Sequence, residues 1–522
     1  MASAAAPADG QIGTTPEVEE KPHLTTENYW LLVLGIMGAS TLQILDSTIA
    51  NVALPHMQTA LGATRETITW VLTSYIVASA VALPATGWLA DRFGGRRLMI
   101  VAVAGFIITS MLCGMAQNLA QMVLFRSLQG LTGAFIMPLS QAFILDITRP
   151  SRHSQMMGLW GMGVMIGPIL GPILGGWLTE SANWRWVFYI NLPLGILSLA
   201  ALIAYLPHRE RIERRFDFLG FTLLAISLST LQLLLDRGTL LDWFESGEIW
   251  IYSVIALGAG WMAVIHLATK KDPLFNTALM KDRNFTFALC FMLVVGVILI
   301  SMMALLPPML QNLFGYGVID TGIVLMPRGV GILISMITAN YLSRRNFDPR
   351  VIISAGCLIC ALSLWQMAHW SLVVDEMTVI ATGLLQGIGL GLTFIPLQSS
   401  AFATLSPRFR TDGSSLLNLS RSLGGSIGIS LLTAIWGGNL QTSHSDQVSN
   451  ITATTFSVFD VASIDRFQPT GDMAMVALNA EINRQAAMVA YVDDFYLMMW
   501  LTLAVAPLAF LMKRNQAPPP AR

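Results

Sequence analysis

The stretch WLLVLGIMGASTLQILDSTIANV, Trp30 to Val52, decides the fold class. It contains a single charged side chain, Asp46, in an otherwise apolar and small-residue run. A run of about 20 such residues is long enough to cross the hydrocarbon core of a bilayer as one helix. Working outward from it, we find fourteen segments of this kind along the 522 residues. The sequence therefore predicts an all-α integral membrane protein.

Composition agrees with this class and excludes several others. Hydrophobic residues make up 54% of the chain and charged residues 12%, whereas soluble domains carry about 25% charged residues. The net charge of -1 leaves no basic excess for binding nucleic acid. The four cysteines lie in apolar runs, and the pair Cys357 and Cys360 is more typical of helix packing than of a metal or redox site.

Enzyme and nucleotide-driven functions lack their motifs. No lysine follows a glycine, so the chain has no Walker A loop. The seven histidines show no paired metal spacing, and no Gly-x-Ser-x-Gly elbow occurs. We therefore expect a transporter rather than an enzyme, driven by an ion gradient, without cofactor or metal.

Basic residues predict the orientation. If both termini are cytoplasmic, the outer connections carry only Arg65, Arg185, Arg237, Arg466 and Arg484, and the inner segments carry nearly all other Lys and Arg. This matches the positive-inside rule. Because the first 28 residues lack a basic region followed by a cleavage pattern, we expect no removable signal peptide.

An internal repeat predicts two similar halves. LQGLTGAFIMPLSQAF, Leu128 to Phe143, resembles LQGIGLGLTFIPLQSSAF, Leu385 to Phe402. Two six-helix bundles facing each other across a central cavity are a transporter arrangement. We predict an N-terminal tail (1–29), a first bundle (30–206), a linker with two inserted transmembrane helices (207–268), a second bundle (285–512) with a long outer loop (437–494), and a C-terminal tail (513–522).

Charges inside the spans are the candidate functional residues, because a lone charge in the bilayer is costly. Asp46 can take and release a proton if its surroundings alternate between wet and dry; the alternative is that it only pairs with another helix. Arg126 lies at a similar depth and is the expected partner. We assign Asp46 and Arg126 to proton coupling, and Gln43, Asn51, Gln129, Arg328 and Arg421 to a substrate cavity, although Arg328 and Arg421 could equally snorkel.

The fifth span is rich in small residues and proline. Its motif comprises Gly163, Gly167, Pro168, Gly171, Pro172, Gly175 and Gly176. Glycines four residues apart let helices approach closely, and the prolines bend the axis. This predicts a tight, flexible face between the two halves; a static packing face is the alternative.

The loop after the second span combines an acid, glycines and a basic cluster in GWLADRFGGRRLMI, Gly87 to Ile100. Asp91 against the nearby arginines could act as a conformational latch at the cytoplasmic face. The candidate latch residues are Gly87, Asp91, Arg92, Gly94, Arg96 and Arg97.

These motifs together resemble a known family. The loop resembles the signature of the major facilitator superfamily between its second and third helices, Phe125 to Gly130 (FRSLQG) resembles its fourth-helix motif, and Gly163 to Gly176 resembles its antiporter motif. Fourteen spans, LDSTIANVALP (Leu45 to Pro55) and NWRWVFYINLPLG (Asn183 to Gly195) are similar to the drug:proton antiporter group of the EmrB and QacA type. Gly95 departs from the loop signature, where a basic residue is usual.

The resemblance implies a major facilitator fold and proton-coupled export of hydrophobic toxic compounds or drugs, as in antibiotic resistance. It places Asp46 and Arg126 in proton-relay positions. It also implies a bacterial inner membrane, a periplasmic adaptor (membrane fusion) protein and an outer-membrane channel. A proton-coupled symporter of a small nutrient or metabolite is the alternative, because Asp46 would serve either direction; the Gly- and Pro-rich fifth span favours export.

Overall fold

The computed structural model describes residues 22–64, 67–209, 211–345, 347–449 and 471–513. Within these ranges the regular structure is helical and contains no strand. The described ranges contain fourteen helices that are long and apolar enough to cross a membrane. The predicted all-α class and the predicted number of spans are therefore confirmed, and the chain is a multi-pass membrane protein.

The spanning helices follow the predicted order, and some crossings are built from two or three consecutive helices. The N-terminal half comprises α1 (Tyr29–Ala60), α2 (Trp70–Ala82), η1 (Leu83–Ala85), α3 (Thr86–Phe93), α4 (Gly95–Met115), α5 (Leu119–Gly133), α6 (Ile136–Ile147), α7 (His153–Ser181), α8 (Trp186–Tyr189) and α9 (Asn191–Tyr205). The inserted pair is α10 (Phe218–Arg237) and α11 (Gly247–Thr269), followed by the short α12 (Thr277–Lys281). The C-terminal half comprises α13 (Arg283–Phe314), α14 (Val318–Arg344), α15 (Pro349–Met367), α16 (Glu376–Ala403), α17 (Arg410–Ser449), α19 (Gly471–Val505) and η7 (Ala506–Leu511).

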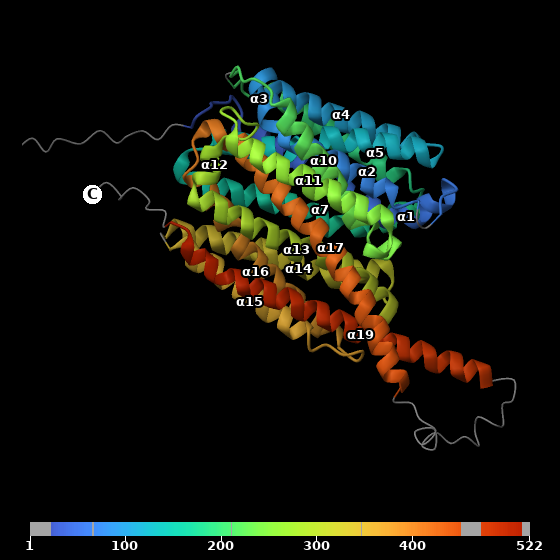
Figure 1. Ribbon diagram of the computed structural model, residues 1–522. Coiled ribbons are helices and arrows are strands. Elements are labelled where there is room, and N and C mark those ends of the chain that lie inside the picture. The colour runs from blue at the N-terminus through green and yellow to red at the C-terminus, as the bar shows by residue number, and fades with distance from the viewer. Residues whose placement is uncertain (1–21, 65–66, 210, 346, 450–470, 514–522) are drawn as a thin grey trace, which may run out of the picture.

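The bundle has two distinct ends. Helices α17 and α19 project beyond the other helices at one end, which we call the hairpin end (Figure 1). The opposite end carries α3, α12 and the 206–217 linker, and we call it the linker end. Leu24 donates a backbone hydrogen bond to the Asp146 carbonyl at 2.8 Å, and the Lys513 N–H donates to Asn284 at 2.6 Å. Both ends of the described chain thus lie at the linker end, as an even number of spans requires.

The long connection predicted between the last two spans differs from a simple loop. Residues 437–449 continue α17, and residues 471–494 belong to α19. The polar stretch from Met473 to Ala490 is helical, because polar side chains at a helix surface need not interrupt it. Residues 450–470 of this connection lie outside the described ranges.

The inserted pair joins the two halves at the hairpin end of α10. Thr73 of α2 donates a hydrogen bond to the Asp236 carboxylate of α10. Ser430 of α17 donates to the Leu235 carbonyl at 2.6 Å. Helix α10 therefore contacts the N-terminal and C-terminal halves at neighbouring residues.

The glycine-rich face of α7 packs against α1 within the N-terminal half. Thr41 and Thr48 of α1 donate hydrogen bonds to the Gly163 and Gly167 carbonyls, at 2.8 and 3.3 Å. A Cβ atom added at Gly171 would lie 2.1 Å from Thr48 Oγ1. Small residues at a spacing of four thus permit close helix contact. Gly175 also faces α1, while Pro168 and Pro172 lie inside α7 without ending it.

This arrangement corrects the prediction that the glycine face lies between the two halves. A different face of α7 meets the C-terminal half: a Cβ at Gly161 would lie 3.2 Å from Met336 of α14, and one at Gly322 of α14 would lie 2.8 Å from Ile173. The spacing of glycines reveals a close helix contact, but it does not reveal which helix is the partner. Here the partner is α1, the helix that carries Asp46.

We predict that Gly167→Leu destabilises the protein by about 1–3 kcal/mol, the usual cost of overpacking. A Cβ at this position would already lie 3.0 Å from the Leu45 backbone N, next to Asp46. The measurement is thermal unfolding in detergent. Gly258→Leu in α11 is the control, because no atom lies within 4 Å of a Cβ there. Equal unfolding midpoints for the two variants would contradict the close packing of α7 on α1.

Candidate functional site

Asp46 of α1 forms a buried ion pair with Arg126 of α5. Arg126 Nη1 donates to Asp46 Oδ2 at 2.7 Å. The Asp46 residue is 1% exposed and Arg126 is 0% exposed. The pairing expected from their similar depths is therefore present.

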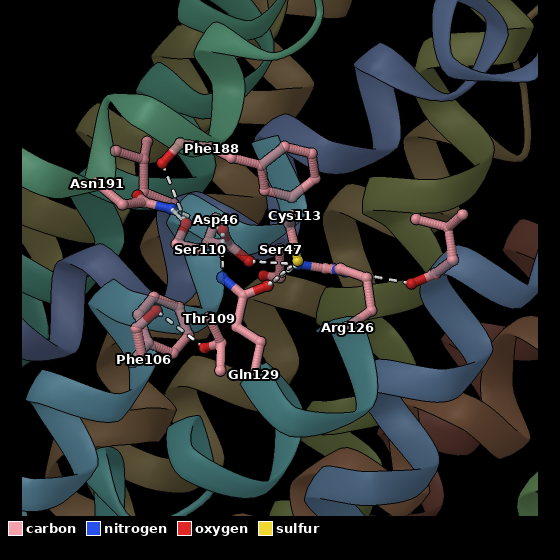
Figure 2. Close-up of polar contacts among 12 residues, drawn as sticks. Asp46, Ser47, Phe106, Thr109, Ser110, Cys113, Arg126, Gln129, Phe188 and Asn191 are labelled. Carbon is pink, nitrogen blue, oxygen red and sulfur yellow. Dashed lines mark hydrogen bonds and ion pairs between the residues drawn. The ribbon is translucent and has the colours of Figure 1, made fainter. Parts of the chain in front are cut away.

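Two amide side chains complete the coordination of the Asp46 carboxylate (Figure 2). Gln129 Nε2 donates to Oδ1 at 2.9 Å, and Asn191 Nδ2 donates to the same oxygen at 2.7 Å. Gln129 Oε1 in turn accepts a hydrogen bond from Arg126 Nη1 at 2.7 Å. Asp46, Arg126 and Gln129 thus form a closed ring of hydrogen bonds. We call these three residues and Asn191 the Asp46 network.

Four helices hold these groups in place. Arg126 and Gln129 are three residues apart on α5, so they lie on one face of the helix. Asn191 is the first residue of α9, and its Nδ2 also lies 2.8 Å from Ser110 Oγ of α4. The sequence placed Gln129 in a substrate cavity, whereas here it is a ligand of the Asp46 carboxylate.

The remaining surface of Arg126 is also covered. Its Nε donates to the Val71 carbonyl at 3.2 Å, and its guanidinium carbon lies 4.5 Å from the centroid of the Tyr75 ring. An aromatic face stabilises a cation at this distance. The guanidinium is thus held by a carboxylate, an amide, a carbonyl and an aromatic ring, which together fix its position.

This arrangement can exchange a proton only by rearranging. Three side chains donate hydrogen bonds to the Asp46 carboxylate, and one of them is the Arg126 cation. A proton on Asp46 would remove the charge that Arg126 pairs with, and would leave an unpaired cation in a buried site. Protonation of Asp46 and its pairing with Arg126 are therefore competing states.

Asn191 and Ser110 were not among the predicted site residues. Asn191 lies in the run FYINLPLG, where a neutral amide interrupts an apolar span. That interruption was the available signal, because a buried amide needs hydrogen-bond partners. The partner itself, on a helix 145 residues earlier, could not be read from the pattern.

Gln43 and Asn51, two other predicted cavity residues, lie on different sides of α1. Asp46 and Gln43 are three residues apart and lie near one face, and the Gln43 Oε1 atom is buried without a hydrogen-bond partner in the described chain. Asn51 is exposed. A separation of five residues turns a helix by about 140° beyond a full turn, so Asn51 lies on a different side of α1 from Asp46.

The second-half arginines do not contact the Asp46 network. Arg328 of α14 is 8% exposed, and its Nε and Nη2 atoms have no hydrogen-bond partner among the described residues. Gln386 of α16 aligns with Gln129 in the internal repeat and is buried. Its Nε2 and Oε1 atoms also have no hydrogen-bond partner among the described residues. Arg421 of α17 donates to Asn418 Oδ1 at 3.1 Å.

The cysteines show no metal or redox arrangement in the described residues. Cys113, Cys357 and Cys360 are buried free thiols, and no cluster of metal-ligating side chains occurs in the described ranges. Cys113 lies beside the Asp46 network, with its Sγ atom 3.6 Å from Gln129 Oε1.

Asp91 forms an ion pair at the linker end, but its basic partner comes from the linker and not from its own loop. Arg214 Nη1 lies 3.3 Å from Asp91 Oδ2 and 2.9 Å from Asp412 Oδ2 of α17. Burial lowers the pKa of the Arg214 guanidinium, but the neighbouring Asp412 and Asp91 carboxylates raise it more, so the pKa lies above its ordinary value. The charged Arg214 therefore joins an acid of each half.

The arginines of the loop itself have other positions. Arg92 and Arg97 are exposed, and Arg96 contacts His208 and donates to the Ile203 carbonyl at 2.7 Å. The prediction that Asp91 pairs with these three side chains is thus wrong, because α3 turns Asp91 toward α17.

The two loop glycines have separate structural roles. A Cβ at Gly87 would lie 1.5 Å from Asp412 Oδ1, so this position needs glycine for the close approach of α3 to α17. Gly94 has a φ of +91°, which favours glycine at the turn between α3 and α4.

A second set of contacts closes the linker end. Arg410 Nη1 of the C-terminal half donates to Asp146 Oδ1 of the N-terminal half at 2.7 Å. Arg209 of the linker lies 3.8 Å from Asp146 Oδ2 and donates to the Pro407 carbonyl at 2.8 Å. The two halves are thus held together at the linker end by two acid–arginine clusters.

We predict a coupling energy of about 0.5–3 kcal/mol between Asp46 and Arg126, as is typical of contacting charged residues. Arg126→Gln should destabilise the protein strongly, because it leaves a buried carboxylate without its cation. Combining it with Asp46→Asn should cost less than the sum of the two single changes, measured by unfolding in detergent. The pair Asp46→Asn with Arg421→Gln is the control and should be additive; additivity in both pairs would contradict the ion pair.

We predict that Arg214→Gln opens the linker end, because it leaves the Asp91 and Asp412 carboxylates facing each other. Spin labels at positions 152 and 408, one in each half, should move apart when measured by pulsed electron paramagnetic resonance. Arg152 and Arg408 are exposed, and so is Arg215, whose change to Gln is the matched control. An unchanged distance distribution in Arg214→Gln would contradict the role of Arg214.

Comparison with known proteins agrees with this architecture. The chain is 33% identical to the fatty acid resistance protein FarB of Neisseria gonorrhoeae, covering 92% of this chain and 95% of that protein. It is 32% identical to the probable multidrug resistance protein EmrY of Escherichia coli, covering 90% and 93%, and 35% identical to the multidrug export protein EmrB of the same species, covering 80% and 82%.

A solved structure and a family model place the fold. The human organic anion transporter MFSD10 has a similar structure, with a TM-score of 0.58, 15% identity, and coverage of 91% of this chain and 99% of that one. At this identity the likeness concerns the fold alone. The family model of the Major Facilitator Superfamily matches residues 36–429. The chain therefore belongs to the major facilitator superfamily, and it is a membrane transporter rather than an enzyme.

Proposed function

We propose that this protein is a proton-coupled antiporter that exports hydrophobic toxic compounds or drugs by alternating access. The observation that carries the proposal is the buried Asp46 network, in which one carboxylate can hold either Arg126 or a proton. The names of its relatives, which include multidrug export, multidrug resistance and fatty acid resistance proteins, support export rather than nutrient uptake.

The proposed location is the bacterial inner membrane, with the linker end and both termini in the cytoplasm. The distribution of Lys and Arg along the sequence supports this orientation. In that orientation the two acid–arginine clusters close the cytoplasmic side. The conformation described here is then the one that blocks access from the cytoplasm.

The coupling step follows from the competition at Asp46. A proton arriving from the outer side neutralises the carboxylate and releases Arg126, which weakens the contact between α1 and α5. Because α7 packs closely on α1 and contacts α14 with another face, movement of α1 can reach the interface between the halves. Proton release to the cytoplasm restores the ion pair, and no cofactor is needed.

We place the substrate cavity between the halves and assign Arg328 and Arg421 to it, with Gln43 nearby. Arg328 and Gln386 offer buried hydrogen-bond donors that lack partners among the described residues. A buried cation without a partner is costly, so an anionic or polar group on an otherwise apolar substrate would stabilise it. The fatty acid resistance relative is consistent with such a substrate.

We further propose that the projecting parts of α17 and α19 dock a periplasmic adaptor that leads to an outer-membrane channel. These parts extend beyond the rest of the bundle (Figure 1). They present exposed apolar side chains, including Val448 and Val476. Exposed apolar residues on a projecting polar helix are suited to a protein contact.

The test of the central proposal is uphill export, measured as substrate uptake into inside-out vesicles or proteoliposomes with an acidic lumen. Asp46→Asn should abolish gradient-driven transport, because an amide cannot titrate, while the protein remains folded and inserted. Efflux of a lipophilic cation and of an uncoupler-like weak acid should be compared with and without the gradient. Normal uphill transport by Asp46→Asn would remove Asp46 from the mechanism.

A further inference from the structure

Asp494 is a buried acid that the Asp46 mechanism does not use. It lies in α19, the last spanning helix, and is 0% exposed. Neither carboxylate oxygen has a hydrogen-bond partner among the described residues. No Lys, Arg or His of those residues forms an ion pair with it either, in contrast to Asp46, Asp91, Asp146 and Asp412.

The immediate surroundings of Asp494 are aromatic. Phe495 packs against Trp370 in an edge-to-face contact with ring centroids 6.0 Å apart. Tyr491, one turn before Asp494, packs against Trp436 of α17 at 5.4 Å. The indole nitrogens of Trp370 and Trp436 are buried and have no hydrogen-bond partner in the described chain. None of these aromatic side chains carries a positive charge that would offset an ionised Asp494.

Ionisable groups on the same helix do not compensate Asp494. Asp493 accepts a hydrogen bond from Asn439 of α17 at 3.0 Å and, when ionised, opposes a second negative charge beside it. The Tyr496 hydroxyl lies 3.3 Å from His369 Nε2, so that histidine is engaged elsewhere. The Tyr491 phenol is the other titratable group on this part of α19.

The helices packed against α19 also lack a compensating cation. On α17, Arg421 is fifteen residues from Trp436, about 22 Å along the helix axis. Arg410 and Asp412 of α17 take part in the linker-end clusters, and His444 contacts Asn479. On α15, Cys357 and Cys360 face α16, and Arg350 lies beside Asp348 at the start of the helix. The titratable side chains of α13 include Arg283 and the exposed Cys290.

An ionised carboxylate with neither hydrogen bonds nor a cation is costly in such a site, and a neutral carboxylic acid avoids most of that cost. We propose that Asp494 is a second proton-binding site, located in the C-terminal half, which holds a proton in this conformation and loses it when the outer side closes and the cytoplasmic side opens. The ligand is a single proton, because no cluster of metal-ligating side chains that could hold a larger cation occurs in the described ranges. This inference rests on the proposed antiport.

The position of Asp494 parallels that of Asn191. Each residue lies on the sixth spanning helix of its half, α9 and α19 respectively. In the N-terminal half this helix supplies an amide that holds an ionised acid from α1. In the C-terminal half it supplies the acid itself, and no amide or cation of the described residues is bound to that acid. The two halves would thus carry an ionised acid and a protonated acid in the same conformation.

Infrared spectroscopy of the purified full-length protein in lipid tests the protonation state. At pH 7, the parent minus Asp494→Asn difference spectrum should contain the carbonyl stretch of one protonated carboxylic acid, shifted in heavy water. Asp493→Asn is the matched control and should retain that band. If Asp494→Asn retains it too, Asp494 is ionised and the proposal is wrong.

A second measurement separates a proton carrier from a permanently neutral acid. In proteoliposomes, the number of protons exchanged per substrate should fall by about one in Asp494→Asn and remain unchanged in Asp493→Asn. Loss of the band with an unchanged proton count would overturn the carrier role. If the parent itself exchanges no protons, the proposed antiport fails, and the infrared result still reports separately whether Asp494 holds a proton.

Discussion

A charge in the hydrocarbon region must be paired, hydrated or neutralised, and this constraint organises the whole molecule. Asp46 satisfies it through Arg126, Gln129 and Asn191, which draw α1, α5 and α9 together. Because the carboxylate is the shared partner of all three, its protonation changes several helix contacts at once. Protonation of the Asp46 carboxylate would thereby affect the packing of helices in the N-terminal half.

Close packing connects α1 to the other half. The glycines of α7 allow α1 to lie in direct contact, and the opposite face of α7 meets α14. At the linker end, Arg214 connects Asp91 and Asp412, while Asp146 binds Arg410. The linker is therefore part of the closure between the halves as well as a covalent connection.

The sequence predicted those features that follow from local pattern or from the cost of charge burial. Span number comes from apolar run length, and the pairing of Asp46 with Arg126 comes from their similar depth in a membrane. The role of Asn191 and the pairing of Asp91 with Arg214 were not predictable, because a pattern does not specify which distant helix packs against which. The sequence analysis grouped Asn51 with Gln43 as a cavity residue near Asp46. Because Asn51 is five residues from Asp46 along the helix, its side chain lies on another side of α1.

The central claim is that substrate and proton are linked through Asp46. Calorimetric titration of the purified protein with a transported substrate, repeated in buffers of different ionisation enthalpy, counts the protons released on binding without any membrane gradient. We predict proton release by the parent protein and a release smaller by about one proton in Asp46→Asn, with substrate binding retained. The same proton count in both proteins would contradict the account.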